Sequence, residues 1–332
     1  MVFTASVADR HHFGMNHFAY RLSELHLDIM ESSFCDIRLP YRPMKYEGES
    51  LYSSYVVGCV LNAFLCYTAI MLNITTIYAV KKTSSLSQPS KILLFHLAAS
   101  DLGIGLLCQP FFLALLVKLL QNNSPSCPTY VAFASILPLF SFASFLGVMI
   151  MSLDRFLAIY LHLRYQEVMT HQRVTKVVIS LWVFSLSLSL VMLWSPINIT
   201  TVIFTIFDVG CLVTTTFLNY KIYLAVRHHR NAISALQVQN GDEMANALRI
   251  RKSALGAFYV YLVFVLCYLP NICLYAVVPI FGVTTVVKSL TIYTVTIAFL
   301  NSSLNPIIYC WKMRHIRCAV MDILRNARLR RN

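Results

Sequence analysis

Long apolar segments separated by short polar ones make up most of the chain. A helix needs about 20 apolar residues to cross the hydrocarbon core of a bilayer, which is about 30 Å thick. Seven segments reach this length, at residues 53–80, 91–117, 129–157, 174–195, 199–226, 253–279 and 288–311. The pattern predicts an all-α membrane protein, built as a bundle of seven transmembrane helices.

The stretch after the seventh segment has a different pattern. Ile316, Val320 and Ile323 recur at helical spacing, and Arg317 and Asp322 lie between them. This pattern predicts a short amphipathic eighth helix on the membrane surface. We therefore expect three regions, an extracellular amino-terminal segment (1–52), a seven-transmembrane domain (53–311), and an amphipathic helix with a basic cytosolic tail (312–332).

Composition supports a membrane protein and argues against a nucleic-acid-binding protein. Hydrophobic residues make up 58% of the 332 positions and charged residues only 12%, whereas about 25% of a soluble domain is charged. The net charge is +13, but most of the 27 Lys and Arg lie between or after the apolar segments. This placement indicates the positive-inside bias of membrane proteins, with anionic lipid headgroups as the partner.

The basic loops also predict an orientation. Lys81 and Lys82 follow the first apolar segment, and Arg164 and Arg173 follow the third, so these loops are expected on the cytosolic side. Seven crossings then place the amino terminus outside the cell and the carboxyl terminus in the cytosol. Residues 1–49 lack the pattern of a cleaved signal peptide, so we expect the first helix to target this multi-pass protein to the plasma membrane.

Residues predicted outside the membrane include candidates for modification. Asn122 and Asn198 begin glycosylation sequons in predicted outer loops. Cys35 and Cys127 are the two cysteines expected outside the cell, and they either form a disulfide or remain free thiols, because the sequence gives no geometry. Cys318 on the predicted eighth helix is either a palmitoylation site or a plain apolar-face cysteine.

Ionisable groups at membrane depth are few, and such groups are functional candidates because they are costly there. Asp101 lies in the second segment. It could form a sodium site with oxygen atoms of other buried polar residues, namely Ser144, Asn301, Ser302 and Asn305. The alternative is a hydrogen-bonded polar core that fixes helix packing.

Two further features lie toward the cytosolic ends of helices. Asp154 and Arg155 close the third segment and would form either a functional pair or a simple membrane anchor. Pro306 interrupts the seventh segment and frees a backbone carbonyl, so Asn305 beside it can both repair the break and form part of a hinge. Tyr309 follows one turn later.

These residues together resemble the motifs of the rhodopsin-like G-protein-coupled receptors. The resemblance covers nearly the whole membrane region, with one motif per predicted helix in the expected order. The matching positions are Asn73, Asp101, Asp154-Arg155-Phe156, Trp182, Tyr220, Phe264 with Cys267-Tyr268-Leu269-Pro270, and Asn305-Pro306-Ile307-Ile308-Tyr309. Each motif alone is weak, whereas the ordered set is specific.

The resemblance implies a receptor that a ligand switches between two states to activate a heterotrimeric G protein. Arg155 would leave Asp154 and meet Tyr220 and the tail of a Gα subunit. Leu163 in the following inner loop would pack into the G protein. In the sixth helix, Phe264, Tyr268 and Pro270 would transmit the ligand signal, while Tyr309 swings inward.

Several positions depart from the family pattern. Phe156 replaces a Tyr, His162 and Leu212 each replace a Pro, and Tyr268 stands at the position of the family's toggle Trp. Ile250 and Arg251 supply no acid at the start of the sixth helix, so a lock between Arg155 and that helix is unavailable. We therefore predict appreciable ligand-free activity. The absence of the usual Cys pair and the short outer loop are similar to the melanocortin, adenosine, cannabinoid and lysophospholipid receptors.

The candidate ligand-binding residues are Leu137, Asp208, Tyr268 and Tyr275. Leu137 stands where amine receptors have an Asp, which argues against a biogenic amine, and no Lys is expected at membrane depth for a retinal Schiff base. Asp208 is then the one charge expected in the pocket, where it either binds a ligand or hydrogen-bonds to Thr205. The other pocket residues favour a small apolar molecule, a lipid or a peptide anchor.

Other classes fit the sequence less well. A transporter often has inverted repeats, and seven crossings do not divide into two halves. A seven-helix protein that binds a ligand without coupling is a second alternative. The sequence has no catalytic pair or metal-ligand spacing at membrane depth, so we expect no enzyme and no cofactor other than an allosteric sodium ion.

Overall fold

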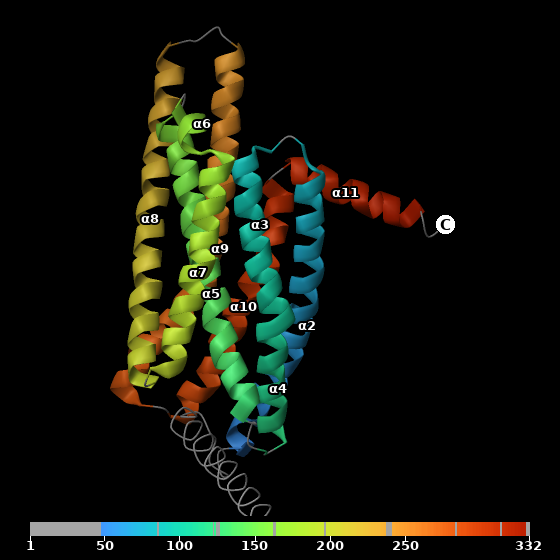
Figure 1. The fold of residues 1–332 in the computed structure, drawn as a ribbon, viewed down its shortest axis with the longest axis vertical. Helices are drawn as coiled ribbons and strands as arrows, with labels where there is room; N and C mark the ends of the chain where they lie inside the picture. The colour runs from blue at the N-terminus through green and yellow to red at the C-terminus, as the bar shows by residue number, and fades with distance from the viewer. Residues whose placement is uncertain are drawn as a thin grey trace, which may run out of the picture.

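The computed structural model describes residues 48–84, 86–121, 123, 127–161, 164–195, 197–236, 241–282, 284–312 and 314–329. In these ranges the chain is helical and contains no strand, and its long helices run side by side (Figure 1). The helices are α2 (Gly48–Lys82), α3 (Gln88–Gly103), η2 (Ile104–Cys108), α4 (Gln109–Leu120), α5 (Cys127–Tyr160), α6 (Tyr165–Val168), α7 (His171–Trp194), α8 (Ile197–Leu236), α9 (Gly241–Phe281), α10 (Thr285–Lys312) and α11 (Arg314–Leu329). Each of the seven predicted apolar segments forms helix.

Six stretches of the described chain are long and apolar enough to cross a membrane, by length and composition. They are Ser50–Lys82, Gln88–Leu120, Cys127–Tyr160, His171–Trp194, Ile199–His228 and Leu255–Val278. Helix α10, the seventh predicted segment, is not among them because it contains Lys288 and a run of Asn and Ser residues. It packs between α2 and α9 and buries these polar side chains, which completes the predicted seven-helix bundle.

The second predicted segment contains a wide helical turn that the apolar pattern did not predict. Residues 104–108 form the π-helix η2 between α3 and α4. Pro110 lies two residues after η2 and has no N–H to donate to a carbonyl of the preceding turn. At Gly105 an added Cβ would lie 3.1 Å from the Ala69 Cβ, so this glycine allows close approach to α2.

Helices α8 and α9 continue well beyond their apolar segments and extend past the other helices at one end of the bundle (Figure 1). Helix α11 leaves the bundle at the same end and runs across its axis (Figure 1). It contacts α2 and α10, burying Ile316 and Ala319 while Arg317 and Cys318 are exposed. This arrangement agrees with the predicted amphipathic eighth helix.

Polar contacts between helices accompany apolar packing in the interior. The Asn62 amide donates to Thr296 Oγ1 over 2.8 Å, and the Asn73 amide donates to the Ser302 carbonyl over 2.9 Å. Both bonds join α2 to α10. Hydrogen bonds of this kind between membrane helices contribute about 0.6 kcal/mol each, so they fix the position of α10 in the bundle together with the packing around Phe299.

Candidate functional site

A cavity of about 280 Å³ lies at the end of the bundle where α4, α7 and α9 finish and α5, α8 and α10 begin. Its walls are mainly aliphatic and aromatic, with Leu116, Phe133 and Phe299 among them. All four predicted ligand-binding residues line it: Leu137, Asp208, Tyr268 and Tyr275. A concave, mostly apolar pocket with a few polar groups is typical of a small-molecule site.

Asp208 of α8 is the buried carboxyl group of this cavity. Its side chain is only 4% exposed, and its Oδ1 atom has no hydrogen-bond partner in the described part of the chain. The alternative bond between Asp208 and Thr205 is not formed, and the Thr205 hydroxyl donates to the Thr201 carbonyl over 2.9 Å. Asp208 therefore has an oxygen available for a hydrogen bond from a ligand.

The prediction that Asp208 is the one charge of the pocket is wrong. Lys288, in the first turn of α10, also lines the cavity and is buried. A Lys in an otherwise apolar segment is the sequence signal that could have identified it. The cavity thus presents one acidic and one basic side chain, on α8 and α10.

An aromatic cluster forms the floor of the cavity. Phe145 of α5 contacts Tyr268 and Phe264 of α9, with ring centroids 4.5 Å and 4.6 Å apart, and the two α9 rings are 4.7 Å apart. Phe145 and Tyr268 line the cavity, whereas Phe264 lies one turn deeper. A ligand that displaces the Tyr268 ring would therefore change the packing of α9 against α5.

Below this floor lies a buried polar core around Asp101. Asn305 donates from its amide to Asp101 Oδ2 over 2.9 Å, which joins α10 to α3. The other residues of the predicted sodium set, Ser144, Asn301 and Ser302, are also fully buried, and their side-chain polar atoms have no hydrogen-bond partner among the described residues. The Tyr309 hydroxyl is also buried and has no hydrogen-bond partner among the described residues.

The residues of this core fit a small hard cation. One carboxylate with amide and hydroxyl oxygens is a donor set suited to such an ion. In the described ranges no group of three or more His, Cys, Asp and Glu exists that could hold a metal ion, so the core offers no thiolate or imidazole site. The five residues come from α3, α5 and α10, which the bundle brings together.

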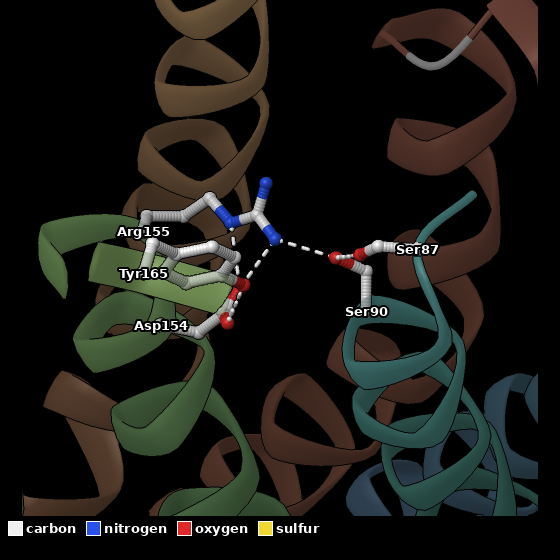
Figure 2. A network of polar contacts seen from close by, with 5 residues as sticks. All are labelled: Ser87, Ser90, Asp154, Arg155 and Tyr165. Carbon is white, nitrogen blue, oxygen red and sulfur yellow. Dashed lines mark hydrogen bonds and ion pairs between the residues drawn. The ribbon is translucent and has the colours of Figure 1, made fainter. Parts of the chain in front are cut away.

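The opposite end of the bundle holds a second polar network (Figure 2). Arg155 forms an ion pair with Asp154, donating from Nε to Oδ2 over 2.9 Å, and its Nη2 donates to Ser90 Oγ of α3 over 2.7 Å. Tyr165 of α6 donates from its hydroxyl to Asp154 Oδ1 over 2.6 Å. The exposed Ser87 donates to Ser90 over 2.9 Å. Both Asp154 oxygens are therefore paired.

Sequence reasoning found the Asp154–Arg155 pair but missed Ser90 and Tyr165. Burial and the Asp154 charge raise the pKa of Tyr165, so its phenol stays protonated and remains a donor. Ser90 follows Pro89 in the first turn of α3. Pro89 marks the start of a helix, but it does not indicate a contact between Ser90 and Arg155. The Ser90 contact arises because α3 packs against α5, and the Tyr165 contact arises because α6 lies beside the end of α5.

The remaining residues predicted for signalling or modification do not join the cavity, the Asp101 core or the Arg155 network through any contact described above. Tyr220 of α8 is 57% exposed, so it faces away from the buried interior. Pro270 lies within α9, and Pro306 lies within α10, where it is buried. Leu163, Asn122 and Cys35 lie outside the described residues, as does the side chain of Asn198.

The cysteine predictions have a partial outcome. Cys127 is disulfide-bonded. Cys318 on α11 is free and exposed, and seven further cysteines of the described chain are also free. The pairing of Cys127 with Cys35 and the palmitoylation of Cys318 stay predictions.

Comparison with known proteins agrees with this arrangement. The profile of the family described as 7 transmembrane receptor (rhodopsin family) matches residues 72–196 and 193–309. The adenosine receptor A2b of Gallus gallus is 30% identical over 131 residues, which are 40% of this chain and 37% of the relative. The adenosine receptor A3 of Ovis aries is 22% identical over 77% of this chain and 86% of the relative. The olfactory receptor 51A7 of Homo sapiens is 36% identical over 32% of this chain and 34% of the relative.

The chain thus spans between a third and two fifths of the length of several curated relatives that it matches at 30% identity or more. The family profile, by contrast, covers most of the chain, from the middle of α2 to Tyr309 near the end of α10. It includes Asp101, Arg155 and Asp208, each of which lies at the centre of one of the three polar sites. The chain belongs to the rhodopsin family of seven-transmembrane receptors.

Proposed function

We propose that this protein is a plasma-membrane receptor that converts binding of an extracellular or membrane-derived ligand into activation of a heterotrimeric G protein. Its amino terminus faces outward and its carboxyl terminus faces the cytosol. The basic residues around the ends of α2, α5 and α8 support this orientation, because such residues stay on the cytosolic side.

The observation that carries this proposal is the placement of two sites at opposite ends of one bundle. The cavity with Asp208 lies at the outer end, and the Arg155 network lies at the inner end. Helices α5 and α9 reach from one region to the other, with Phe145 and Phe264 in contact between them. A ligand can therefore shift the equilibrium between two packings of these helices by binding one of them better.

A screen in cells tests this proposal. Cells expressing the receptor and sensors for each Gα class are exposed to a panel of lipids, nucleosides, peptides and small organic molecules. Arg155→Ala should abolish the response and retain ligand binding, whereas Arg317→Ala, at an exposed site of α11, should retain both. A ligand that binds the cavity and activates no Gα would show instead a receptor that does not couple.

The cavity chemistry supports a particular ligand class. Its extensive apolar wall suits a lipid, a small apolar molecule or a peptide anchor, and Asp208 suits a cationic or hydrogen-bond-donating group on that ligand. Relatives named as adenosine receptors match over much of the chain. Adenosine is accordingly one member of the nucleoside panel in the screen.

We also propose that the Asp101 core binds sodium and that the ion favours the ligand-free state. Its support is the set of buried oxygen donors from Asp101, Ser144, Asn301, Ser302 and Asn305. An ion held between α3, α5 and α10 would resist rearrangement of these helices. The role of the site is therefore allosteric regulation of the receptor.

The proposed orientation assigns the modification sites. Asn122 and Asn198 are placed outside the cell as glycosylation sites. Cys127, which is disulfide-bonded, is placed beside Cys35 of the outer amino-terminal segment. Cys318 is exposed on α11 and placed at the inner membrane surface for palmitoylation. Mass spectrometry of the purified receptor tests all three assignments.

A further inference from the structure

Lys312, the last residue of α10, lies against two aromatic rings at the inner end of the bundle. Its Nζ atom is 3.8 Å from the centroid of the Tyr259 ring on α9 and 3.3 Å from that of Trp311 on α10. The two rings are 5.3 Å apart at an angle of 56°. The ammonium group thus contacts one aromatic ring on each helix, and attraction to both rings holds the helices together.

Gly256 shows that the stem of Lys312 also runs along α9. This glycine precedes Tyr259 by almost one turn, and a Cβ added to it would lie 3.8 Å from the Lys312 Cβ. The side chain of Lys312 therefore packs on α9 at Gly256 and reaches Tyr259 with its charged end. A long side chain whose stem packs while its charge finds a partner is well suited to link two helices.

Helix α9 also contacts α10 nearer the cavity, where Thr294 Oγ1 donates to Asn271 Oδ1 over 3.1 Å, so Lys312 adds a separate attachment at the inner end. Tyr261 forms a hydroxyl–hydroxyl hydrogen bond of 2.6 Å with Thr216 of α8, and Phe264 packs on Phe145 of α5. The positions at the start of the sixth predicted helix, Ile250 and Arg251, carry no acid for Arg155. An ion pair from there to the inner network is therefore unavailable.

We propose that Lys312, Tyr259 and Trp311 form a cation–aromatic clamp that holds the inner half of α9 against α10 and makes ligand-free activity lower than it would be without this contact. This inference rests on the proposed function and adds a regulatory contact to it. Lys312 is a positioning residue, since it acts on α9 through Tyr259. A cation–aromatic contact of this kind changes a two-state equilibrium by a factor of about 2 to 30, depending on its exposure.

Ligand-free signalling in cells is the first test, at matched surface expression. Lys312→Gln and Tyr259→Leu should each raise ligand-free signalling about three- to tenfold. Lys312→Arg and Tyr259→Phe should stay near the unmodified receptor, because each keeps a cation or a ring. The double variant Lys312→Gln with Tyr259→Leu should be no more active than either single variant, since the two changes remove the same contact.

Lys221→Gln is the matched control. The Lys221 ammonium lies 5.4 Å from the Phe217 ring, but both residues belong to α8, so this contact joins no second helix. The control should leave ligand-free signalling unchanged. A general effect of removing an inner positive charge would raise signalling in Lys221→Gln as well and would overturn the clamp.

A distance measurement separates the clamp from the proposed function. Spin labels carried by unnatural amino acids at the exposed positions Leu255 of α9 and Ile307 of α10 report their separation in purified receptor without G protein. Lys312→Gln should increase the population with a longer distance, and Lys312→Arg should not. Unchanged distances in Lys312→Gln overturn the clamp even if signalling changes. A longer distance without any signalling supports the clamp and counts against coupling to a G protein.

Discussion

Two buried carboxylates, Asp154 at the proposed inner end of the bundle and Asp208 at the proposed outer end, differ in their hydrogen bonding. Asp154 accepts hydrogen bonds at both oxygens, from Arg155 and from Tyr165. Asp208 is nearly as buried, but its Oδ1 has no partner among the described residues. An unpaired buried polar atom costs about 1–3 kcal/mol, whereas a paired one stabilises the arrangement that pairs it.

We therefore expect substitutions of these two carboxylates to have different effects. The inner network favours the packing in which Arg155 stays on Asp154 and Ser90, so a change there should release activity. Under the proposed function, Asp208 Oδ1 would gain a partner when a ligand binds, so a substitution there should lower affinity. Asp101 lies between these extremes, because Asn305 pairs one of its oxygens and the other has no partner in the described chain.

Removing the charge of Asp208 should have the largest effect. Asp208→Asn keeps the size of the side chain but weakens a bond to a cationic or donor group of the ligand. A hydrogen bond to a charged group is worth about 1.5–3 kcal/mol, so agonist potency should fall about 10- to 100-fold. Concentration–response curves for an agonist from the screen measure this change.

Thr205→Val is the matched control for this prediction. It removes a hydroxyl on the same helix that already bonds to the Thr201 carbonyl, so potency should not change. If potency is the same in Asp208→Asn and in the unmodified receptor, Asp208 does not bind the ligand. A fall in the melting temperature of purified Asp208→Asn at unchanged potency would assign it a structural role.

Weakening the inner network should raise ligand-free activity about tenfold. Asp154→Asn leaves a hydrogen-bond acceptor in place but removes the charge that holds Arg155. Charge-assisted bonds are about twice as strong as neutral ones, and the lost 1.4 kcal/mol or so corresponds to that factor. Second-messenger accumulation without ligand measures it, and an unchanged or lower signal in Asp154→Asn would show that the pair does not restrain the receptor.

The helices could be predicted because the membrane imposes their minimum length, but their ends could not. The first segment was predicted from residue 53, whereas α2 begins at Gly48. Helices α8 and α9 also continue past their apolar segments, since a helix can extend into water without further apolar residues. The π-helix η2 lies beside Pro110 and the close contact of Gly105 with α2. The spacing of apolar residues in the sequence does not reveal such local packing.

The candidate sites were predictable where a residue is unusual for its place along the chain. Asp101, Arg155 and Asp208 are ionisable groups in or at the end of apolar segments, and each lies at the centre of a polar site. Tyr165 and Tyr259 carry no such signal, because tyrosines are ordinary at the ends of membrane helices. Their contacts with Asp154 and Lys312 depend on how helices far apart in the sequence meet.

Exchanging sodium for a large organic cation should change ligand-free activity about fivefold, the low end of typical allosteric couplings. The expected direction is an increase, because the proposed ion favours the ligand-free state. Asp101→Asn should remove this sodium dependence. The measurement is G-protein activation in membranes at constant ionic strength, and equal sodium dependence in Asp101→Asn and the unmodified receptor would show that the ion acts elsewhere.

Removing the Tyr165 hydroxyl should have the smallest effect, because Asp154 keeps its contacts with Arg155. Tyr165→Phe deletes one hydrogen bond to Asp154 Oδ1, and a typical net loss of 0.5–1.5 kcal/mol predicts about a threefold rise in ligand-free activity. Tyr160→Phe is the control, since Tyr160 is 75% exposed and stacks on Phe156 through its ring. Because Tyr165 is the one of these two tyrosines that donates to Asp154, a difference between the two variants isolates that bond. Equal activity in both would mean that the two Arg155 contacts with Asp154 hold the inner network without help from α6.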